Sequence, residues 1–155
     1  MEELHHRMKR QEAIEMIFDR HGPDALYVTC TGYISRSAYK IKPEWHILYI
    51  QGSMGLSPAI GLGIALNTDK EVVVFTGDGA LLMHLGTTHT IRDSQVDNLH
   101  IYVLDNGCYE SVGGQKCSPL EEYPCVKIIK IEQSEADPRI PLDWFEIRNK
   151  IEEWI

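Results

Sequence analysis

Thr76-Gly77-Asp78-Gly79-Ala80 and, further along the chain, Asp105-Asn106-Gly107 are the most informative stretches of this 155-residue sequence. Each follows a short apolar run rich in β-branched residues, at 72–75 and 101–104. Such runs are typical of strands that are buried on both faces of a parallel sheet. Residues 80–92 have helical length and contain no proline. The region therefore predicts a strand, a helix and a second strand.

The rest of the chain also alternates between strand-like and helix-like segments. Further strands are predicted at 26–30, 47–50 and 126–131, and helices at 8–21, 57–66 and from Asp143 onward, where Asp143 and Glu146 have the spacing of a capping box. Alternation of this kind predicts an α/β fold with a mostly parallel sheet flanked by helices on both faces. Without an internal repeat or a linker, residues 1–155 are expected to form one domain.

The composition excludes several classes of protein. With 43% hydrophobic and 25% charged residues, the chain is not of a disordered type, and its net charge of -8 argues against nucleic-acid binding. No apolar run approaches the length of about 20 residues that a membrane span needs. The four cysteines form no C-x-x-C pair and no apolar leader precedes them. We therefore expect reduced thiols and a cytoplasmic location.

Four of the predicted strands lead into loops that contain glycine. These loops are Thr31-Gly32, Gly52-Ser53-Met54-Gly55, Gly77-Asp78-Gly79 and the turn at Gly107. The carboxyl ends of parallel strands meet at one edge of an open α/β sheet, and ligands bind there. The loops thus predict a ligand site at this edge.

Asp78 and Asn106 suit a magnesium ion that also binds a diphosphate. A carboxylate from Asp78, an amide oxygen from Asn106 and the backbone carbonyl of Cys108 would provide three oxygen ligands, the type that Mg²⁺ prefers. Helix N–H groups after Ala80 would face the diphosphate. The alternative is that both motifs are ordinary turns, which is the more common outcome for either motif alone. Their occurrence together on adjacent strand ends favours the site.

Other nucleotide motifs are incomplete in this sequence. Gly61-x-Gly63 would need a small residue where Leu66 stands, and Gly77-x-Gly79 meets Leu82 in the same way. Neither completes the dinucleotide fingerprint, and there is no P-loop motif.

The motifs resemble those of a known family. Gly77-Asp78-Gly79 with Asp105-Asn106 is similar to the thiamine-diphosphate motif of the large decarboxylase and carboligase family, and Gly52-Ser53-Met54-Gly55 resembles its pyrimidine-holding turn. More narrowly, residues 8–115 resemble the sulfopyruvate and phosphonopyruvate decarboxylases, specifically the β subunit, which is the diphosphate-binding half. This resemblance implies thiamine diphosphate and Mg²⁺ as cofactors.

The resemblance also implies roles for individual residues. Asp78, Asn106 and the Cys108 carbonyl would bind the metal. The cofactor-binding residues would be Thr31, Gly32, Ser35, Gly52, Ser53, Met54, Gly77, Asp78, Gly79, Ala80, Asn106, Cys108 and Tyr109. Residues 109–115 would form a glycine-hinged cover near the substrate.

Three features depart from the family pattern. Asp105 replaces the first residue of the usual Asn-Asn pair, whereas the ligand position, Asn106, is kept. The chain is shortened after Gln115, where the family has another helix and strand, so we expect a diphosphate-half domain that is reduced on its C-terminal side. The activating glutamate of the family belongs to the other half, and hence no catalytic residue is assigned in this chain.

The implied function is the diphosphate-binding subunit of a two-chain decarboxylase. Together with an α subunit that carries the pyrimidine-binding domain, in a hetero-oligomer, it would convert a 2-oxo acid such as sulfopyruvate or phosphonopyruvate to an aldehyde and CO₂. Two alternatives remain open at this point: a subunit of an acetolactate-synthase-like carboligase, and a non-catalytic subunit that keeps the fold.

Overall fold

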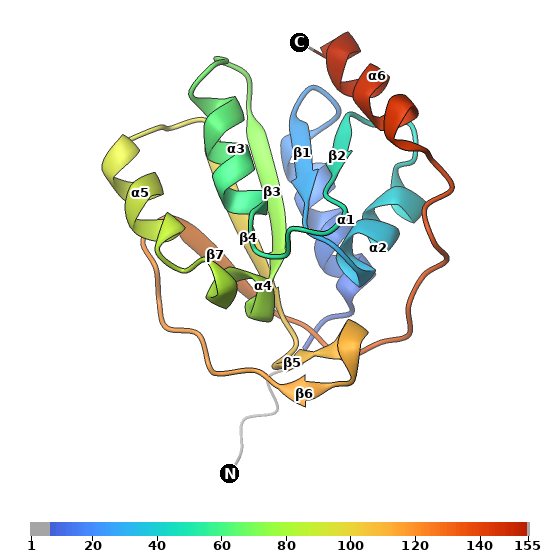
Figure 1. Ribbon diagram of the computed structural model, residues 1–155, viewed down its shortest axis with the longest axis vertical. Helices are drawn as coiled ribbons and strands as arrows, with labels where there is room; N and C mark the ends of the chain where they lie inside the picture. The colour runs from blue at the N-terminus through green and yellow to red at the C-terminus, as the bar shows by residue number, and fades with distance from the viewer. Residues whose placement is uncertain (1–6, 155) are drawn as a thin grey trace.

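The centre of the molecule is a five-stranded parallel sheet. The computed structural model describes residues 7–154. The strands lie in the order β2-β1-β3-β4-β7, and every neighbouring pair is parallel (Figure 1). Their bounds are β1 (Leu26–Thr29), β2 (Ile47–Tyr49), β3 (Val72–Gly77), β4 (Leu99–Asp105) and β7 (Val126–Lys130). The predicted α/β fold with a mostly parallel sheet is confirmed.

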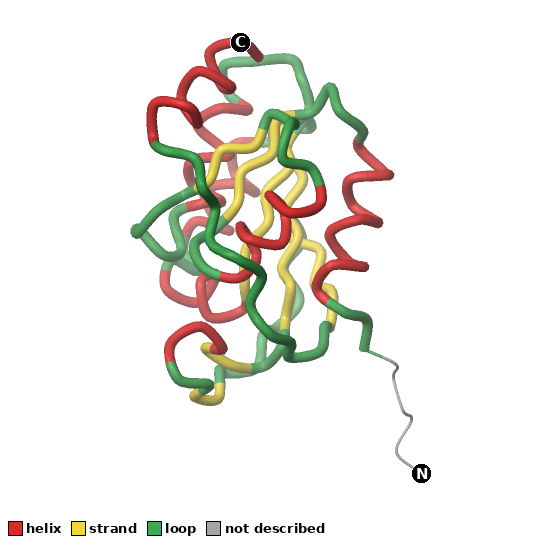
Figure 2. Tube along the Cα trace, turned by 90° about the vertical axis from the view of Figure 1, so that its right-hand side faces the viewer, coloured by secondary structure: helices red, strands yellow, loops and turns green. Residues whose placement is uncertain are grey.

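Helices cover both faces of this sheet (Figure 2). The strands are buried on both faces because successive side chains enter different cores. Tyr27 and Phe75 pack on the side of the first two helices, whereas Val28 and Val74 pack on the opposite side. The helices are α1 (Arg10–His21), α2 (Tyr33–Ile41) and α6 (Trp144–Trp154) on the first side, and α3 (Ser57–Ala65) and α5 (Thr87–Ser94) on the second.

Two helical predictions differ from the structure. Helix α2 was not predicted, although Ile34, Ala38 and Ile41 have helical spacing. Two serines are buried beside them: Ser35 donates a hydrogen bond to the Gly32 carbonyl, and Ser37 donates to Asp137. The single helix predicted for 80–92 is wrong. It is divided into α4 (Asp78–Met83) and α5, with non-helical backbone at His84 between them.

The region between β4 and α6 contains no further α-helix. A small antiparallel hairpin, β5 (Cys108–Tyr109) and β6 (Gln115–Lys116), encloses the short 3-10 helix η1 (Glu110–Val112). After β7, residues 131–143 cross the side of α1 and α2 and lead to α6, which packs against β2. The predicted capping box of α6 is confirmed: Asp143 N–H donates to Glu146 (2.7 Å), and Glu146 N–H donates to Asp143 (2.9 Å).

The sequence led us to expect reduced cysteine thiols and no segment long enough to span a membrane. All four cysteines are free thiols in the structure, and three of them are buried. Over residues 7–154, no helix is long and apolar enough to cross a membrane.

The strand order creates a crevice at one edge of the sheet. From β1 the chain moves outward to β2, then returns to the other side of β1 and continues through β3, β4 and β7. The connections after β1 and β3 therefore diverge at the carboxyl ends of these adjacent strands. Such a reversal point is where open α/β sheets bind ligands. In Figure 1, α4 and the β5–β6 hairpin lie at this end.

Helix α3 provides a matched pair of glycines that tests how closely it packs on β3. A Cβ at Gly61 would lie 2.4 Å from Cγ2 of buried Val74, whereas a Cβ at Gly63 would meet nothing within 4 Å. We expect Gly61→Ala to lower the free energy of unfolding by about 1–3 kcal/mol through overpacking. Gly63→Ala should raise it by roughly 0.5–1 kcal/mol through helix propensity. Urea denaturation measures both, and equal effects of the two substitutions would contradict the packing described here.

Candidate functional site

A cavity lies at the carboxyl ends of three adjacent strands. Its walls come from the residues that follow β1, β3 and β4, and from the β5–β6 hairpin. The lining residues are Arg10, Cys30, Thr31, Tyr33, Ile34, Met54, Gly77, Asp78, Gly79, Ala80, Leu104, Asn106, Cys108, Tyr109, Glu110, Ser111 and Ile131. A cavity thus lies at the edge of the sheet where the glycine-containing loops predicted a ligand site.

Asp78 is the first residue of α4 and is 4% exposed. One of its carboxylate oxygens accepts the N–H of Gly107 at 3.0 Å. Burial, and to a lesser degree the nearby Asp105 carboxylate, raises the pKa of Asp78 above its ordinary value. Among residues 7–154, no lysine or arginine forms an ion pair with Asp78. A buried carboxylate without a counter-charge beside a cavity is well suited to a metal cation.

Asn106 is held in one orientation by two hydrogen bonds. Its amide oxygen accepts the Cys108 N–H at 3.1 Å, and its amide nitrogen donates to Glu110 at 3.0 Å. The oxygen therefore faces the Gly107–Cys108 turn, the same turn that bonds to Asp78 through the Gly107 N–H. Both side chains thus bond to one turn and line the same cavity, and their joint binding of a metal stays a prediction.

Asp105 has a different role from its neighbour. Its carboxylate forms an ion pair with Lys130 of β7 and accepts the Gly107 N–H at 3.0 Å. Asp105 therefore holds the loop and is neutralised within the chain. Its replacement of the family's first asparagine leaves the amide of Asn106 in place.

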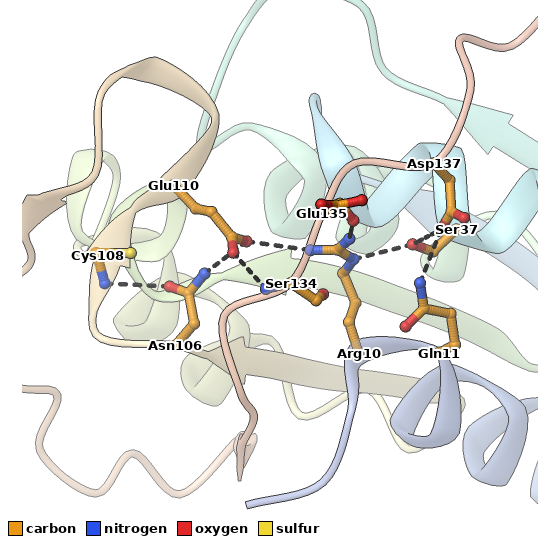
Figure 3. A network of polar contacts seen from close by, with 9 residues as sticks. All are labelled: Arg10, Gln11, Ser37, Asn106, Cys108, Glu110, Ser134, Glu135 and Asp137. Atoms are coloured by element: carbon orange, nitrogen blue, oxygen red, sulfur yellow. Dashed lines mark hydrogen bonds and ion pairs between the residues drawn. The ribbon is translucent and has the colours of Figure 1, made fainter.

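Glu110 connects Asn106 to a buried arginine (Figure 3). Arg10 of α1 is 1% exposed, and its guanidinium donates to Glu110 (3.1 Å), to Ser37 (2.9 Å) and to the backbone carbonyl of Glu135 (2.6 Å). The second oxygen of Glu110 accepts the Ser134 N–H at 2.7 Å. Segments far apart in the sequence thus fix the side chain that orients Asn106.

The turn after β2 also reaches the cavity, although β2 is not adjacent to β3. Gly55, at φ +93°, lies against α4: a Cβ there would be 2.6 Å from a ring nitrogen of His84 and 2.7 Å from the Ala80 carbonyl. This close approach carries the chain past the end of β1 and places Met54 at the cavity wall. Gly52 and Ser53, just before it, are exposed.

The structure brings most of the predicted site residues together. Lining the cavity are Thr31, Met54, Gly77, Asp78, Gly79, Ala80, Asn106, Cys108 and Tyr109. Four predicted residues are not part of the lining. Gly52 and Ser53 lie on the exposed part of the turn, Gly32 lies against Ser111 of η1, and the Ser35 hydroxyl donates to the Gly32 carbonyl in the first turn of α2. Their contact with a cofactor stays a prediction.

Sequence reasoning missed Arg10 and Glu110. Arg10 lies near the start of the predicted helix 8–21, and Glu110 lies within the predicted cover 109–115, but neither was assigned a role. Of these two residues, only Glu110 could have been identified as a candidate from the sequence, because it directly follows the predicted cofactor-binding residues Cys108 and Tyr109. The partner of Glu110 lies 100 residues earlier in the chain, and no local pattern indicates that contact.

Comparison with known proteins agrees with this geometry. A family model described as the thiamine pyrophosphate enzyme, C-terminal TPP binding domain, matches residues 28–132. The chain belongs to this family. The matched region includes the ends of β1, β3 and β4, and therefore most of the cavity wall of this TPP-binding domain.

Curated relatives narrow the comparison. The chain is 39% identical over 108 residues to sulfopyruvate decarboxylase subunit beta of Methanocaldococcus jannaschii, and 42% identical over 108 residues to the same subunit of Methanothermobacter thermautotrophicus. It is 40% identical over 110 residues to phosphonopyruvate decarboxylase of Streptomyces viridochromogenes. These alignments cover 70%, 70% and 71% of this chain, but 57%, 58% and 28% of the relatives. The matched part is thus a little over half of each beta subunit.

The buried Arg10–Glu110 pair gives a stability prediction. Arg10→Met should lower the free energy of unfolding by about 1–3 kcal/mol, because it leaves the partly buried Glu110 carboxylate without its counter-charge. Adding Glu110→Gln should recover part of this loss. Arg92→Met, at an exposed ion pair with Asp93, is the matched control and should change stability by less than about 1 kcal/mol. Chemical denaturation measures all three, and equal losses at Arg10 and Arg92 would exclude a structural role for the buried pair.

Proposed function

We propose that this chain binds the diphosphate end of thiamine diphosphate through Mg²⁺. The metal ligands are the Asp78 carboxylate, the Asn106 amide oxygen and the backbone carbonyl of Cys108. The observation that supports this assignment best is the buried, uncompensated carboxylate of Asp78 in the same cavity wall as the oriented amide of Asn106. Both are oxygen donors of the kind that Mg²⁺ binds together with phosphate.

Backbone around α4 provides the contacts to the diphosphate. Gly77, Gly79 and Ala80 line the cavity beside Asp78, and their N–H groups are the proposed donors to the diphosphate. Gly79 has no room for a side chain, since a Cβ would lie 2.4 Å from the ring of Tyr109. Met54, Thr31 and Tyr109 form the adjoining wall, and the exposed Gly52–Ser53 turn lies where a second chain can complete the site.

The activity we propose is that of a decarboxylase subunit acting on a 2-oxo acid such as sulfopyruvate or phosphonopyruvate, with an aldehyde and CO₂ as products. The cofactor supplies the electron sink for loss of CO₂. This chain binds and orients the cofactor, and its hairpin excludes water from the cavity.

A partner chain with the pyrimidine-binding domain is part of the proposal. Among the lining residues of the described chain, Asp78 and Glu110 are the carboxylates. Asp78 is assigned to the metal, and Glu110 is bound by Arg10, Asn106 and Ser134. The proposal therefore assigns the acid that exchanges protons with the cofactor to the pyrimidine-binding domain, outside the described residues. The names of the relatives, which include the words subunit beta, fit a two-chain enzyme.

Titration calorimetry with Mg²⁺ and thiamine diphosphate tests the cofactor site, with and without the candidate α chain. Asp78→Asn should weaken binding by more than about tenfold, because the metal loses its charged ligand. Asp69→Asn, the same substitution on an exposed turn, should bind like the unchanged protein. If the unchanged protein binds no cofactor, either alone or with the α chain, the proposal is wrong and the non-catalytic alternative is favoured.

The reconstituted pair also distinguishes the enzymatic alternatives. We expect aldehyde formation from sulfopyruvate or phosphonopyruvate only when both chains are present. Supplying a second carbonyl compound separates decarboxylation from carboligation: an acyloin product would indicate an acetolactate-synthase-like carboligase instead. The reading frame next to this one is the first place to look for the partner.

A further inference from the structure

Two histidines and a glutamate meet at the end of the sheet opposite to the cofactor cavity. His21 ends α1, Glu71 directly precedes β3, and His100 is the second residue of β4. One ligand atom from each, two ring nitrogens and a carboxylate oxygen, lie within 4.8 Å of one another. His21 Nδ1 is 2.9 Å from one oxygen of Glu71, and His100 Nε2 is 3.3 Å from the other.

These separations match a tetrahedral metal site. Zinc binds imidazole nitrogen and carboxylate oxygen at about 2.0–2.2 Å, so that ligand atoms at tetrahedral angles lie roughly 3.3 Å apart. Two histidines, one glutamate and a water molecule form a common set of four ligands for this ion. The cluster therefore has the ligand types, and its two nitrogen-to-oxygen separations of 2.9 and 3.3 Å are near the tetrahedral value.

Tyr102 orients the first of the two imidazoles. Its hydroxyl lies 2.8 Å from His21 Nε2, and its side chain is 2% exposed. Histidines that bind metals usually donate their second ring N–H to a fixed acceptor, which leaves the other nitrogen bare. Two tautomers of His21 fit these distances. In one, Nδ1–H donates to Glu71 and Nε2 accepts the Tyr102 hydroxyl; in the other, Nε2–H donates to Tyr102 and Nδ1 carries the lone pair that a metal ion needs.

The charges around His100 favour its neutral form. Burial, the neighbouring His21 and Lys127 all lower the pKa of His100 below its ordinary value, against the opposing effect of Glu71. Metal binding needs the neutral imidazole, so this shift works in its favour. Lys127, whose ammonium lies 5.3 Å from the centre of the Tyr102 ring, opposes a second cation, and the Glu71 carboxylate offsets it.

An open cavity gives access to the cluster. It has a volume of about 470 Å³, and its walls include His21, Glu71 and a third histidine, His46. The Nδ1 atom of His46 is buried and has no hydrogen-bond partner within residues 7–154. The cavity therefore has room for a water molecule beside His21 and Glu71.

We propose that His21, Glu71 and His100 bind one Zn²⁺ ion, with water as the fourth ligand. The ion connects the end of α1 to the starts of β3 and β4. This site is separate from the proposed magnesium site, and it does not depend on the proposed activity of the chain.

The test uses the full chain with His5→Ala and His6→Ala as the background, because the tandem histidines lie outside the described residues and bind metals in solution. Calorimetry should find one Zn²⁺ per chain, and the melting temperature should rise with Zn²⁺. Glu71→Gln and His100→Gln should each weaken binding at least tenfold. His89→Gln, an exposed histidine on α5, is the matched control and should change nothing. Asp78→Asn should leave this binding intact, which separates it from the magnesium site.

Direct spectroscopy of the background protein keeps the test independent of how the variants fold. Co²⁺ should give the visible absorption of a tetrahedral nitrogen and oxygen site without a thiolate band. Zn²⁺ should shift the NMR signals of the ring nitrogens of His21 and His100. The proposal is overturned if the background protein binds no Zn²⁺, if binding survives both cluster substitutions, or if these ring signals do not move.

Discussion

The buried guanidinium of Arg10 is the constraint on which the arrangement around the cavity depends. At 1% exposure it must have all its N–H groups satisfied within the protein. Ser37 of α2, Glu110 of the hairpin and the backbone of Glu135 satisfy three of its donors. The N-terminal helix, the hairpin over the cavity and the segment that leads to α6 are therefore fixed relative to one another by one side chain. Through Glu110, the same contact sets the orientation of Asn106.

The two ends of the sheet differ in chemistry. At the carboxyl ends of the strands, oxygen donors and glycine backbone line the cavity of a TPP-binding domain, the family to which the chain belongs. At the amino ends, imidazoles gather around Glu71. Hard cations prefer the first set of donors, whereas ions such as zinc accept the second. The strands between them are apolar on both faces, which keeps the two sets apart.

The sequence allowed the main strands to be predicted, and with them a cavity that Asp78 and Asn106 both line. Both predictions depend on local apolar runs and on the rule that parallel strands end together. Helix α2 was missed although Ile34, Ala38 and Ile41 have helical spacing. The sequence could not indicate that Ser37 is buried, because its partner Asp137 lies 100 residues away. The division between α4 and α5 was missed for a related reason. Helical length is visible in residues 80–92, but the contact of Gly55 with His84 and Ala80 at the division is not. In each case the missing information lies in a contact distant in sequence.

The ion pairs beside the cavity also determine the net charge of its carboxylates. Lys130 cancels Asp105, and Arg10 cancels Glu110, so that a single negative charge remains, on Asp78. An anion that arrives alone is repelled by that charge, whereas the same anion carrying a divalent cation is attracted to it. The charge of Asp78 thus favours a metal-bound polyanion over the free polyanion, independently of how well either fits the cavity. Asp105, the residue that departs from the family pattern, leaves this net charge unchanged only because Lys130 forms an ion pair with it.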